Sequence, residues 1–376
     1  MAEYIASIKL SIAITHYQKQ KAMPIKVICW NIFKIGSGKL NKTLTSVVRN
    51  CGLGNTVLDY IVKFVTGSTV WNNGAAGVPA DVFIIIEMIS NRQGKGNAAT
   101  GSAVRTQQRL VDAMNNTMIA RGLQAQYVYA CVAQQNISRG ETVGVIYNTV
   151  TLNNTDARSI RDNAGHWLGP RTPFLARFTT VAAPITPLNF IAIHAPTKDG
   201  DDYDEPLEFA DDLARIPQII QQGETVAIMG DYNCSTCSRK WVQRVNGAKR
   251  RLVQVYGFDD LRALNYTTEI PNPMRQTPTP TNIYSSVKKK VDNGNLPPLN
   301  YMSDAYDTAL YHLGAPAPVV QNVNNLIATA QNTIGPVMQG TTQINNLDML
   351  YPNNLPTLLR VYNLVSDHFP VTMTIG

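Results

Sequence analysis

Short apolar segments, separated by polar or glycine-containing stretches, dominate the hydrophobic pattern of this chain. They are rich in Val and Ile and too short for the 3.6-residue periodicity of a helix, so they predict buried strands. The predicted strands are Ile25–Trp30, Asp81–Ile86, Gln126–Val132, Thr142–Tyr147, Phe174–Val181, Asn189–Ile193, Thr225–Met229, Asp307–Tyr311 and Pro370–Ile375.

Two longer segments have helical periodicity. Ser102 to Arg121 places Val111, Met114 and Met118 on one face, and a glycine follows it. Pro206 to Gln222 has a similar apolar face and also ends before a glycine. Strands outnumber helices, and some strands follow one another directly, which argues against a purely alternating parallel sheet. A mixed sheet, or two packed sheets with helices outside, is therefore expected.

Composition changes this picture only in part. The 376 residues carry 33 Lys and Arg against 26 Asp and Glu, a formal charge of +7 that mildly favours an anionic partner. Basic residues gather in 239–251 and 288–290, and acidic residues in 201–205; for each run taken alone, a solvated surface is the favoured explanation. No segment is long enough to span a membrane, and no signal peptide is recognised, so a cytoplasmic location is weakly favoured.

The pattern that carries chemistry is a set of polar residues placed where the predicted strands end. Any one of them has a structural explanation, because an Asp after a strand often caps a turn and a single His is more often structural than catalytic. Together they predict one cluster, since neighbouring strand ends meet at one edge of a sheet. The residues are Asn31, Glu87, His194, Asp231, Asn233, Asp367 and His368.

These residue types suit a divalent metal and phosphate chemistry. Carboxylate and amide oxygens without a cysteine ligand favour Mg²⁺ or Mn²⁺, with Ca²⁺ as a further candidate, over zinc. The Cys234–Cys237 pair has no second pair of ligands nearby, so a structural zinc site is not expected there. A metal and two imidazoles suit the hydrolysis of a phosphate ester, which needs an activated water and stabilised phosphoryl oxygens.

Five motifs resemble the signature of the exonuclease–endonuclease–phosphatase superfamily, and most closely its deoxyribonuclease-I-like branch. In chain order they are Cys29-Trp30-Asn31-Ile32, Asp81-Val82-Phe83-Ile84-Ile85-Ile86-Glu87, Ile193-His194-Ala195-Pro196, Gly230-Asp231-Tyr232-Asn233 and Ser366-Asp367-His368-Phe369-Pro370-Val371. The resemblance implies an α/β fold, a four-layered sandwich of two mixed β-sheets flanked by helices. We expect one catalytic domain over 25–376, after an amino-terminal extension at 1–24, with insertions near 271–300 and 314–346.

The resemblance also implies a role for each matching residue. Glu87 would hold the metal, with help from Asn31 and Asp367. Asp231 would orient or deprotonate the attacking water. Asn233 would donate a hydrogen bond to a phosphoryl oxygen.

The two imidazoles, His194 and His368, would lie on either side of the scissile phosphate as acid, base or charge stabiliser. Each needs a carboxylate partner to fix its tautomer and raise its pKa. Glu141 matches the partner of the first imidazole, and Asp307 matches the partner of the second. Arg171 matches an arginine that contacts the phosphate.

The resemblance therefore implies a divalent-metal-dependent phosphodiesterase, and in particular a nuclease that hydrolyses DNA with little sequence preference. Ala195-Pro196 follows His194 as in the nuclease branch, whereas Met88-Ile89-Ser90 replaces the Thr-Lys of abasic-site endonucleases. The alternative is a phosphatase or phospholipid phosphodiesterase on the same scaffold. A third hypothesis, an inactive member used for binding, is disfavoured because no expected acid, amide or imidazole is missing.

Overall fold

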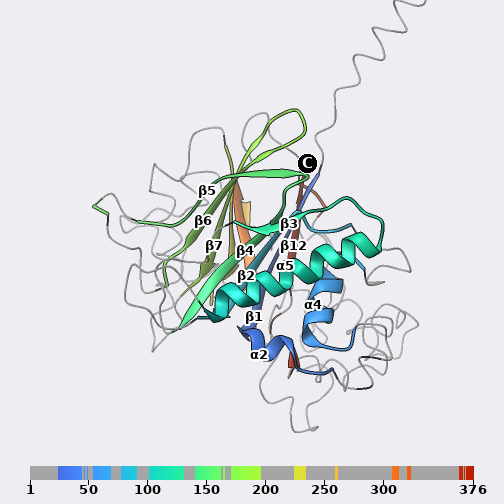
Figure 1. Cartoon of the computed structure of the whole chain (residues 1–376). Helices are drawn as coiled ribbons and strands as arrows, with labels where there is room; N and C mark the ends of the chain where they lie inside the picture. Colours follow the sequence, from blue (N-terminus) through green and yellow to red (C-terminus); the bar gives the residue numbers. More distant parts are fainter. Residues whose placement is uncertain are drawn as a thin grey trace, which may run out of the picture.

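Two β-sheets lie face to face in the computed structural model, and helices cover the outer face of the first sheet (Figure 1). β4 Tyr147 packs against β6 Phe178 between the sheets, with ring centroids 5.0 Å apart. The structure describes residues 24–44, 46, 49, 54–68, 78–90, 101–130, 140–161, 164–165, 171–195, 224–233, 259–260, 307–312, 320–322, 364–366, 368 and 370–376.

The first sheet is a mixed sheet with β1 and β2 at its centre. These two strands are parallel, and every other pair in the sheet is antiparallel. The strands, in spatial order, are β11 (Val320–Asn322), β12 (Val371–Ile375), β1 (Ile25–Ile35), β2 (Val82–Ile89), β4 (Glu141–Asn148) and β3 (Tyr127–Tyr129).

The second sheet repeats this plan around the parallel pair β7 and β8. Its remaining neighbours pair antiparallel. The strands, in spatial order, are β5 (Leu152–Ser159), β6 (Phe174–Thr180), β7 (Pro187–His194), β8 (Thr225–Asp231), β10 (Asp307–His312) and β9 (Asp259–Asp260).

The described helices are α2 (Ser37–Leu40), α4 (Val57–Val65) and α5 (Ser102–Ala120). A capping box starts α4: Asp59 N–H donates to the Thr56 hydroxyl, and the Asp59 carboxylate accepts from Thr56 N–H. The apolar face of α4 packs on β1, where Trp30 lies 5.3 Å from Phe64 and 6.2 Å from Tyr60, measured between ring centroids. None of the described helices is both long and apolar enough to span a bilayer.

This topology brings strand ends from both sheets to one edge of the sandwich. β1, β2, β7 and β8 have their carboxyl ends at this edge, because each parallel pair runs toward it. β10 and β12 run antiparallel to β8 and β1, so their amino ends lie at the same edge. In α/β proteins with parallel central strands, this is the edge where ligands bind.

The predicted fold class is confirmed for the described residues, and each of the nine predicted strands is present. The helix predicted from Ser102 also forms, whereas the helix predicted over Pro206–Gln222 lies outside the described residues. So do the extension at 1–24 except Pro24, the insertion at 271–300, and the basic stretches at 239–251 and 288–290. Within the insertion predicted at 314–346, β11 is described and pairs with β12 at the sheet edge.

Two corrections concern the strands. β1 and β2 continue past Asn31 and Glu87, so these residues lie within strands and not after them. The strand β5 was not predicted because its sequence, LNNTDARS, is mostly polar. It forms the edge of the second sheet, where one partner strand suffices and several of its side chains remain exposed.

One buried side chain in the helix layer is expected to lower stability. Neither the amide oxygen nor the amide nitrogen of Gln107, which is fully buried on α5, has a hydrogen-bond partner in the described part of the chain. Replacing it with the near-isosteric Met is expected to raise the free energy of unfolding by about 1–3 kcal/mol, because a desolvated amide is removed. Urea denaturation measures this change. The same substitution at the neighbouring, exposed Gln108 is the control and should change stability by less than about 0.5 kcal/mol.

Candidate active site

Asn31 connects the two sheets at the edge where the strand ends meet. Its side chain is fully buried, and its Nδ2 group donates to Glu87 Oε1 on β2 and to Asp231 Oδ2 on β8, each at 3.0 Å. The Ser366 hydroxyl donates to the Asn31 carbonyl at 2.5 Å. One amide therefore holds two carboxylates from different sheets close together.

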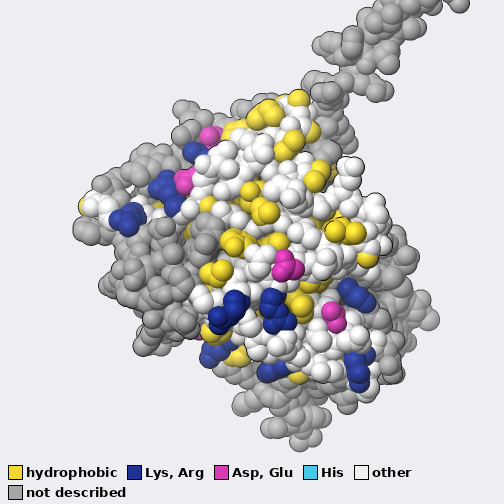
Figure 2. All heavy atoms as spheres, viewed as in Figure 1, with side chains coloured by type: hydrophobic (Ala, Val, Ile, Leu, Met, Phe, Trp, Pro, Cys, Tyr) yellow, Lys and Arg dark blue, Asp and Glu magenta, His cyan; other side chains and the backbone are white. Residues whose placement is uncertain are grey.

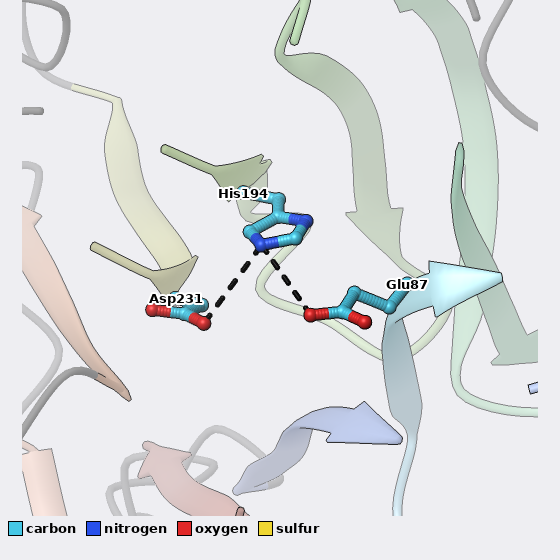
Figure 3. A group of neighbouring side chains, drawn as sticks. All are labelled: Glu87, His194 and Asp231. Atoms are coloured by element: carbon cyan, nitrogen blue, oxygen red, sulfur yellow. Dashed lines mark ion pairs between the residues drawn. The ribbon is translucent and has the colours of Figure 1, made fainter. Parts of the chain in front are cut away.

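Glu87 reaches this position through an irregular backbone. Its φ is 61°, a left-handed conformation that is uncommon for a residue with a side chain. The pairing register of β2 also shifts at Glu87 in both of its ladders, the one with β1 and the one with β4. A bulge re-aims a side chain, and strained backbone in a fold with good packing is often found at functional sites. The strain here turns the carboxylate toward His194 and Asp231 (Figure 3).

His194 and Asp231 are the last residues of the parallel strands β7 and β8, and they lie directly opposite each other. His194 Nε2 is 3.5 Å from Glu87 Oε1 and 3.9 Å from Asp231 Oδ2 (Figure 3). The strands approach closely because Gly230 precedes Asp231. Its φ is 150°, and a Cβ atom there would overlap the Ile193 carbonyl oxygen.

His368 approaches the same carboxylate from the first sheet. Its Nδ1 atom lies 2.7 Å from Asp307 Oδ2, and its Nε2 atom lies 3.9 Å from Asp231 Oδ2. Because an Asp carboxylate accepts hydrogen bonds, Nδ1 carries the proton in this pair. Asp307 lies opposite Asp231 in the antiparallel pair β8–β10. The predicted pairing of His368 with Asp307 is thus present in the geometry.

The surroundings of His194 differ from the expectation. Glu141 Oε2 lies 3.8 Å from His194 Nδ1, beyond hydrogen-bond length, whereas Arg171 Nη1 lies 2.6 Å from His194 Nε2. A guanidinium has no acceptor, so the imidazole Nε2 accepts from it. Burial, together with the charges of Arg171 and His368, holds the pKa of His194 well below its ordinary value of 6.5. The expectation that a carboxylate raises this pKa was wrong.

Asn233 and Arg171 complete the described cluster. The Asn233 side-chain amide donates to the Ala195 carbonyl at 2.7 Å, and its backbone N–H donates to Asp231 Oδ1 at 2.8 Å. Arg171 also donates to the Ala195 carbonyl, at 3.0 Å, and lies 3.5 Å from Glu141 Oε2. Asp367, the third predicted metal ligand, lies outside the described residues.

The side chains present fit a divalent cation. One ligand atom each from Glu87, His194 and Asp231 lies within 4.8 Å of the others, and Asp231, Asp307 and His368 form a second such group. The Asn31 Oδ1 atom is buried beside the first group and has no hydrogen-bond partner in the described part of the chain. An orphaned amide oxygen next to carboxylates matches the oxygen-rich ligand sets that hard cations prefer.

Asp231 is a buried carboxylate at the site with a raised pKa. Only 2% of its side chain is exposed. Burial first, and then the negative charge of Asp307, raise its pKa from 3.8 to about 7, against the opposing effects of His368 and the Asn233 N–H group. A carboxylate that titrates near neutral pH is able both to take a proton from water and to release it.

The two perturbed groups give opposite dependences of stability on pH. For Asp231 the folded pKa is raised, so its contribution to stability falls as pH rises from about 4 to 7. For His194 the folded pKa is depressed, so its contribution is lost as pH falls below 6.5. Just below pH 6.5 the two effects therefore oppose each other, because folding in effect moves a proton from the imidazole to the carboxyl group.

Single substitutions are expected to uncover each effect in the metal-free protein. His194→Gln should make the pH slope of the unfolding free energy more negative than that of the wild type near pH 5.5, where a histidine in the unfolded chain is mostly protonated. Asp231→Asn should make the slope more positive in the same pH range. Urea denaturation in EDTA at several pH values measures both slopes. Parallel curves for the wild type and both variants would contradict the assigned pKa directions.

The sequence interpretation missed residues that position the cluster. The Trp30 indole N–H donates to the His368 carbonyl at 2.8 Å, and the Ser366 hydroxyl accepts from the His368 N–H at 3.0 Å. Both residues lie inside the recognised motifs, but only the fold shows that they tie the segment before β12 to β1. Motif position was the one signal that marked them.

Comparisons with known proteins give similarity in fold at low sequence identity. No protein-family model matches the chain, and no curated protein matches it significantly. Similar solved structures include D. rerio TDP2 humanized by 14 mutations, at 11% identity over 94% of this chain and 99% of that chain, with a TM-score of 0.45.

Two further structures are similar at the same level. The human Nocturnin catalytic domain with bound sulfate has 11% identity, covers 94% of each chain and has a TM-score of 0.44. An endonuclease/exonuclease/phosphatase from Bacteroides vulgatus has 10% identity, covers 94% of this chain and 99% of that chain, and has a TM-score of 0.46. A chemical role for the site must therefore be argued from its side chains.

Proposed function

We propose that this chain is a divalent-metal-dependent phosphodiesterase of the exonuclease–endonuclease–phosphatase superfamily that hydrolyses DNA with little sequence preference. One observation carries the proposal: two imidazoles, His194 and His368, approach the same buried oxygen, Asp231 Oδ2, at 3.9 Å from different sheets. Glu87 lies beside them. This arrangement brings together side chains that can bind a phosphate, activate a water to attack it and offset its negative charge.

Glu87 and Asp231, with Asn31 Oδ1 beside them, are the described residues that would hold the metal. Mg²⁺ or Mn²⁺ fits this oxygen-rich set, and the bound cation would polarise the phosphate and offset its charge. Asp231, with a pKa of about 7, orients the attacking water and accepts its proton.

The imidazoles differ in their neighbours, and this divides their roles. His194 has a lowered pKa and is neutral at pH 7, so with Arg171 beside it the pair presents one positive charge to the phosphate. His368 is held by Asp307 with its Nε2 atom turned toward Asp231. From this position it stabilises the growing negative charge or protonates the departing oxygen. Asn233 supplies a further amide beside Ala195 for a phosphoryl oxygen.

The test is a substrate panel with metal replacement. The purified chain is incubated with supercoiled plasmid, a small phosphodiester, an inositol phosphate and sphingomyelin vesicles, in EDTA and then with Mg²⁺ or Mn²⁺. Metal-dependent nicking of the plasmid is expected, and its rate should fall as salt is added, since phosphate contacts dominate non-specific binding.

Two outcomes would reject this proposal. Release of phosphocholine from the vesicles, or of inorganic phosphate from the inositol phosphate, while the plasmid stays intact, would favour the phosphatase or phospholipid phosphodiesterase alternative. Metal binding without turnover of any phosphate ester would favour a binding protein. Undiminished nicking by both His194→Ala and His368→Ala would reject the assigned roles while leaving the activity itself in place.

A further inference from the structure

A bulge in β1 presents an exposed aromatic ring next to the candidate active site. Asn31 pairs with Ile86 and Ile35 with Met88, so residues 32–34, which we call the Phe33 bulge, lie opposite Glu87 alone. Ile32 is buried, whereas 44% of Phe33 is exposed. Phe33 is two residues from Asn31, so their Cα atoms lie within about 7 Å of each other.

Lysines surround this ring and fix the bulge. Lys39 Nζ, on α2, donates to the carbonyls of Phe33 at 2.5 Å and Ile32 at 3.4 Å, and lies 5.5 Å from the Phe33 ring centroid. Lys34 Nζ lies 5.3 Å from the same centroid. Lys34 also has a φ of 53°, so the chain turns sharply at this residue. The ring is thus exposed on a backbone whose shape is held by specific contacts.

Basic side chains gather over the helices that follow the Phe33 bulge. Figure 2 shows Lys and Arg side chains gathered on the lower part of the face over α2 and α5, with few acidic side chains among them. Arg109 on α5 donates to the Ser37 carbonyl and to the Asn41 side chain, which ties α5 to α2 beside the bulge. The first turns of both helices contain no acidic residue.

We infer that the Phe33 bulge is a subsite for an unpaired nucleotide adjacent to the scissile phosphate, with the base on the Phe33 ring and the neighbouring phosphate beside Lys34. A base has an apolar face that stacks on an exposed aromatic ring, and it can do so when it is not already stacked in a duplex. The Lys34 ammonium group, which lies over the ring 5.3 Å from its centroid, would move to the phosphate of the same nucleotide as the base stacks. A fixed backbone lowers the entropy lost on binding.

This inference rests on the proposed nuclease function and deepens it, because it selects single-stranded or locally opened strands over an intact duplex. Phe33→Ala should lower kcat/KM for a single-stranded oligonucleotide by about 5- to 150-fold, the loss expected for one stacked base. Hydrolysis of bis-p-nitrophenyl phosphate, which has no base, should not change. Phe33→Trp should keep the oligonucleotide activity, and Phe33→Leu should lose it while retaining an apolar side chain.

Controls separate this subsite from the chemistry and from folding. Ile185→Ala removes another exposed apolar side chain, on the turn between β6 and β7, and should change neither activity. Lys34→Gln should reduce the slope of log affinity against log salt by about 0.7, measured by fluorescence anisotropy with a labelled oligonucleotide.

Equal oligonucleotide activity of Phe33→Ala and wild type would overturn the subsite while leaving the proposed function intact. An equal loss of both activities in Phe33→Ala would overturn it too, since the ring would then support the chemistry or the fold. A wild type that turns over the small diester but neither binds nor cleaves the oligonucleotide would reject both the nuclease and its subsite.

Discussion

Glu87→Gln is expected to lower the rate of phosphodiester hydrolysis by about a thousand-fold or more. The substitution preserves side-chain volume and an oxygen that can still accept from Asn31 Nδ2, so the cluster should keep its shape. It removes the charge that would hold the cation. A metal supplies several kcal/mol of transition-state stabilisation, and each 1.4 kcal/mol is a factor of ten in rate.

Metal binding gives a second measurement of the same change that does not depend on turnover. In the wild type, adding Mg²⁺ or Mn²⁺ to the EDTA-treated protein should raise its melting temperature, because a ligand that binds the folded state alone stabilises it. Glu87→Gln should show little of this increase. Glu224→Gln is the matched control: Glu224 pairs with Arg177 at 2.6 Å beside the first residue of β8, whereas Asp231 is its last.

The control variant should bind metal and hydrolyse substrate like the wild type, at some cost in stability. Full activity of Glu87→Gln, with an unchanged response to metal, would remove Glu87 from the site. Loss of activity with a normal response to metal would place Glu87 in the chemistry and not in metal binding.

The strands around the site were predictable because each needs an apolar run to be buried on both faces. β8, for example, is buried along its whole length, and the segment Thr225–Met229 already shows this in its sequence. The polar strand β5 could not be recognised in the same way, since an edge strand takes its stability from one partner. The helix α4 had a local signal, the Thr56–Asp59 capping box, that was not used.

It was easier to predict which residues come together at the site than to predict which of their atoms contact one another. Strand order explains why these residues come together: the parallel central strands β7 and β8 bring His194 and Asp231 to one edge, however far apart they are in sequence. The contacts depend on single backbone irregularities, such as the left-handed φ of Glu87. They also depend on how closely Arg171 and Glu141 approach the two ring nitrogens of His194, at 2.6 Å from Nε2 and 3.8 Å from Nδ1. Neither feature leaves a periodic pattern in the sequence.

The position of the buried acid would favour the binding of a cation at the site. Asp231 lies within reach of Glu87, Asp307 and two imidazoles, and burial first, and then the proximity of the other carboxylates, raises its pKa. A divalent ion would relieve this repulsion and favour the ionised carboxylate. We therefore expect metal affinity to rise with pH up to about 7 and to level off above it, because the cation must displace the proton held by Asp231.

His368→Asn is expected to lower the rate of DNA hydrolysis by about 10²- to 10⁴-fold, the range typical of a positioned general acid or base. Asp307→Asn should give a smaller loss, because the imidazole remains but its tautomer is no longer fixed by a carboxylate 2.7 Å away. The two residues act as one unit. The double variant should therefore be little worse than His368→Asn alone, and a double-mutant cycle measures this coupling.

The leaving group distinguishes the two roles open to His368. If its Nε2 atom protonates the departing oxygen, the loss in His368→Asn should be much smaller for a p-nitrophenyl ester, whose leaving group needs no proton, than for DNA. If it stabilises phosphoryl charge, both substrates should lose activity equally. His312→Asn, at the opposite end of β10 from Asp307, is the matched control and should leave both rates unchanged. Additive losses in the double-mutant cycle would show that Asp307 does not act through His368.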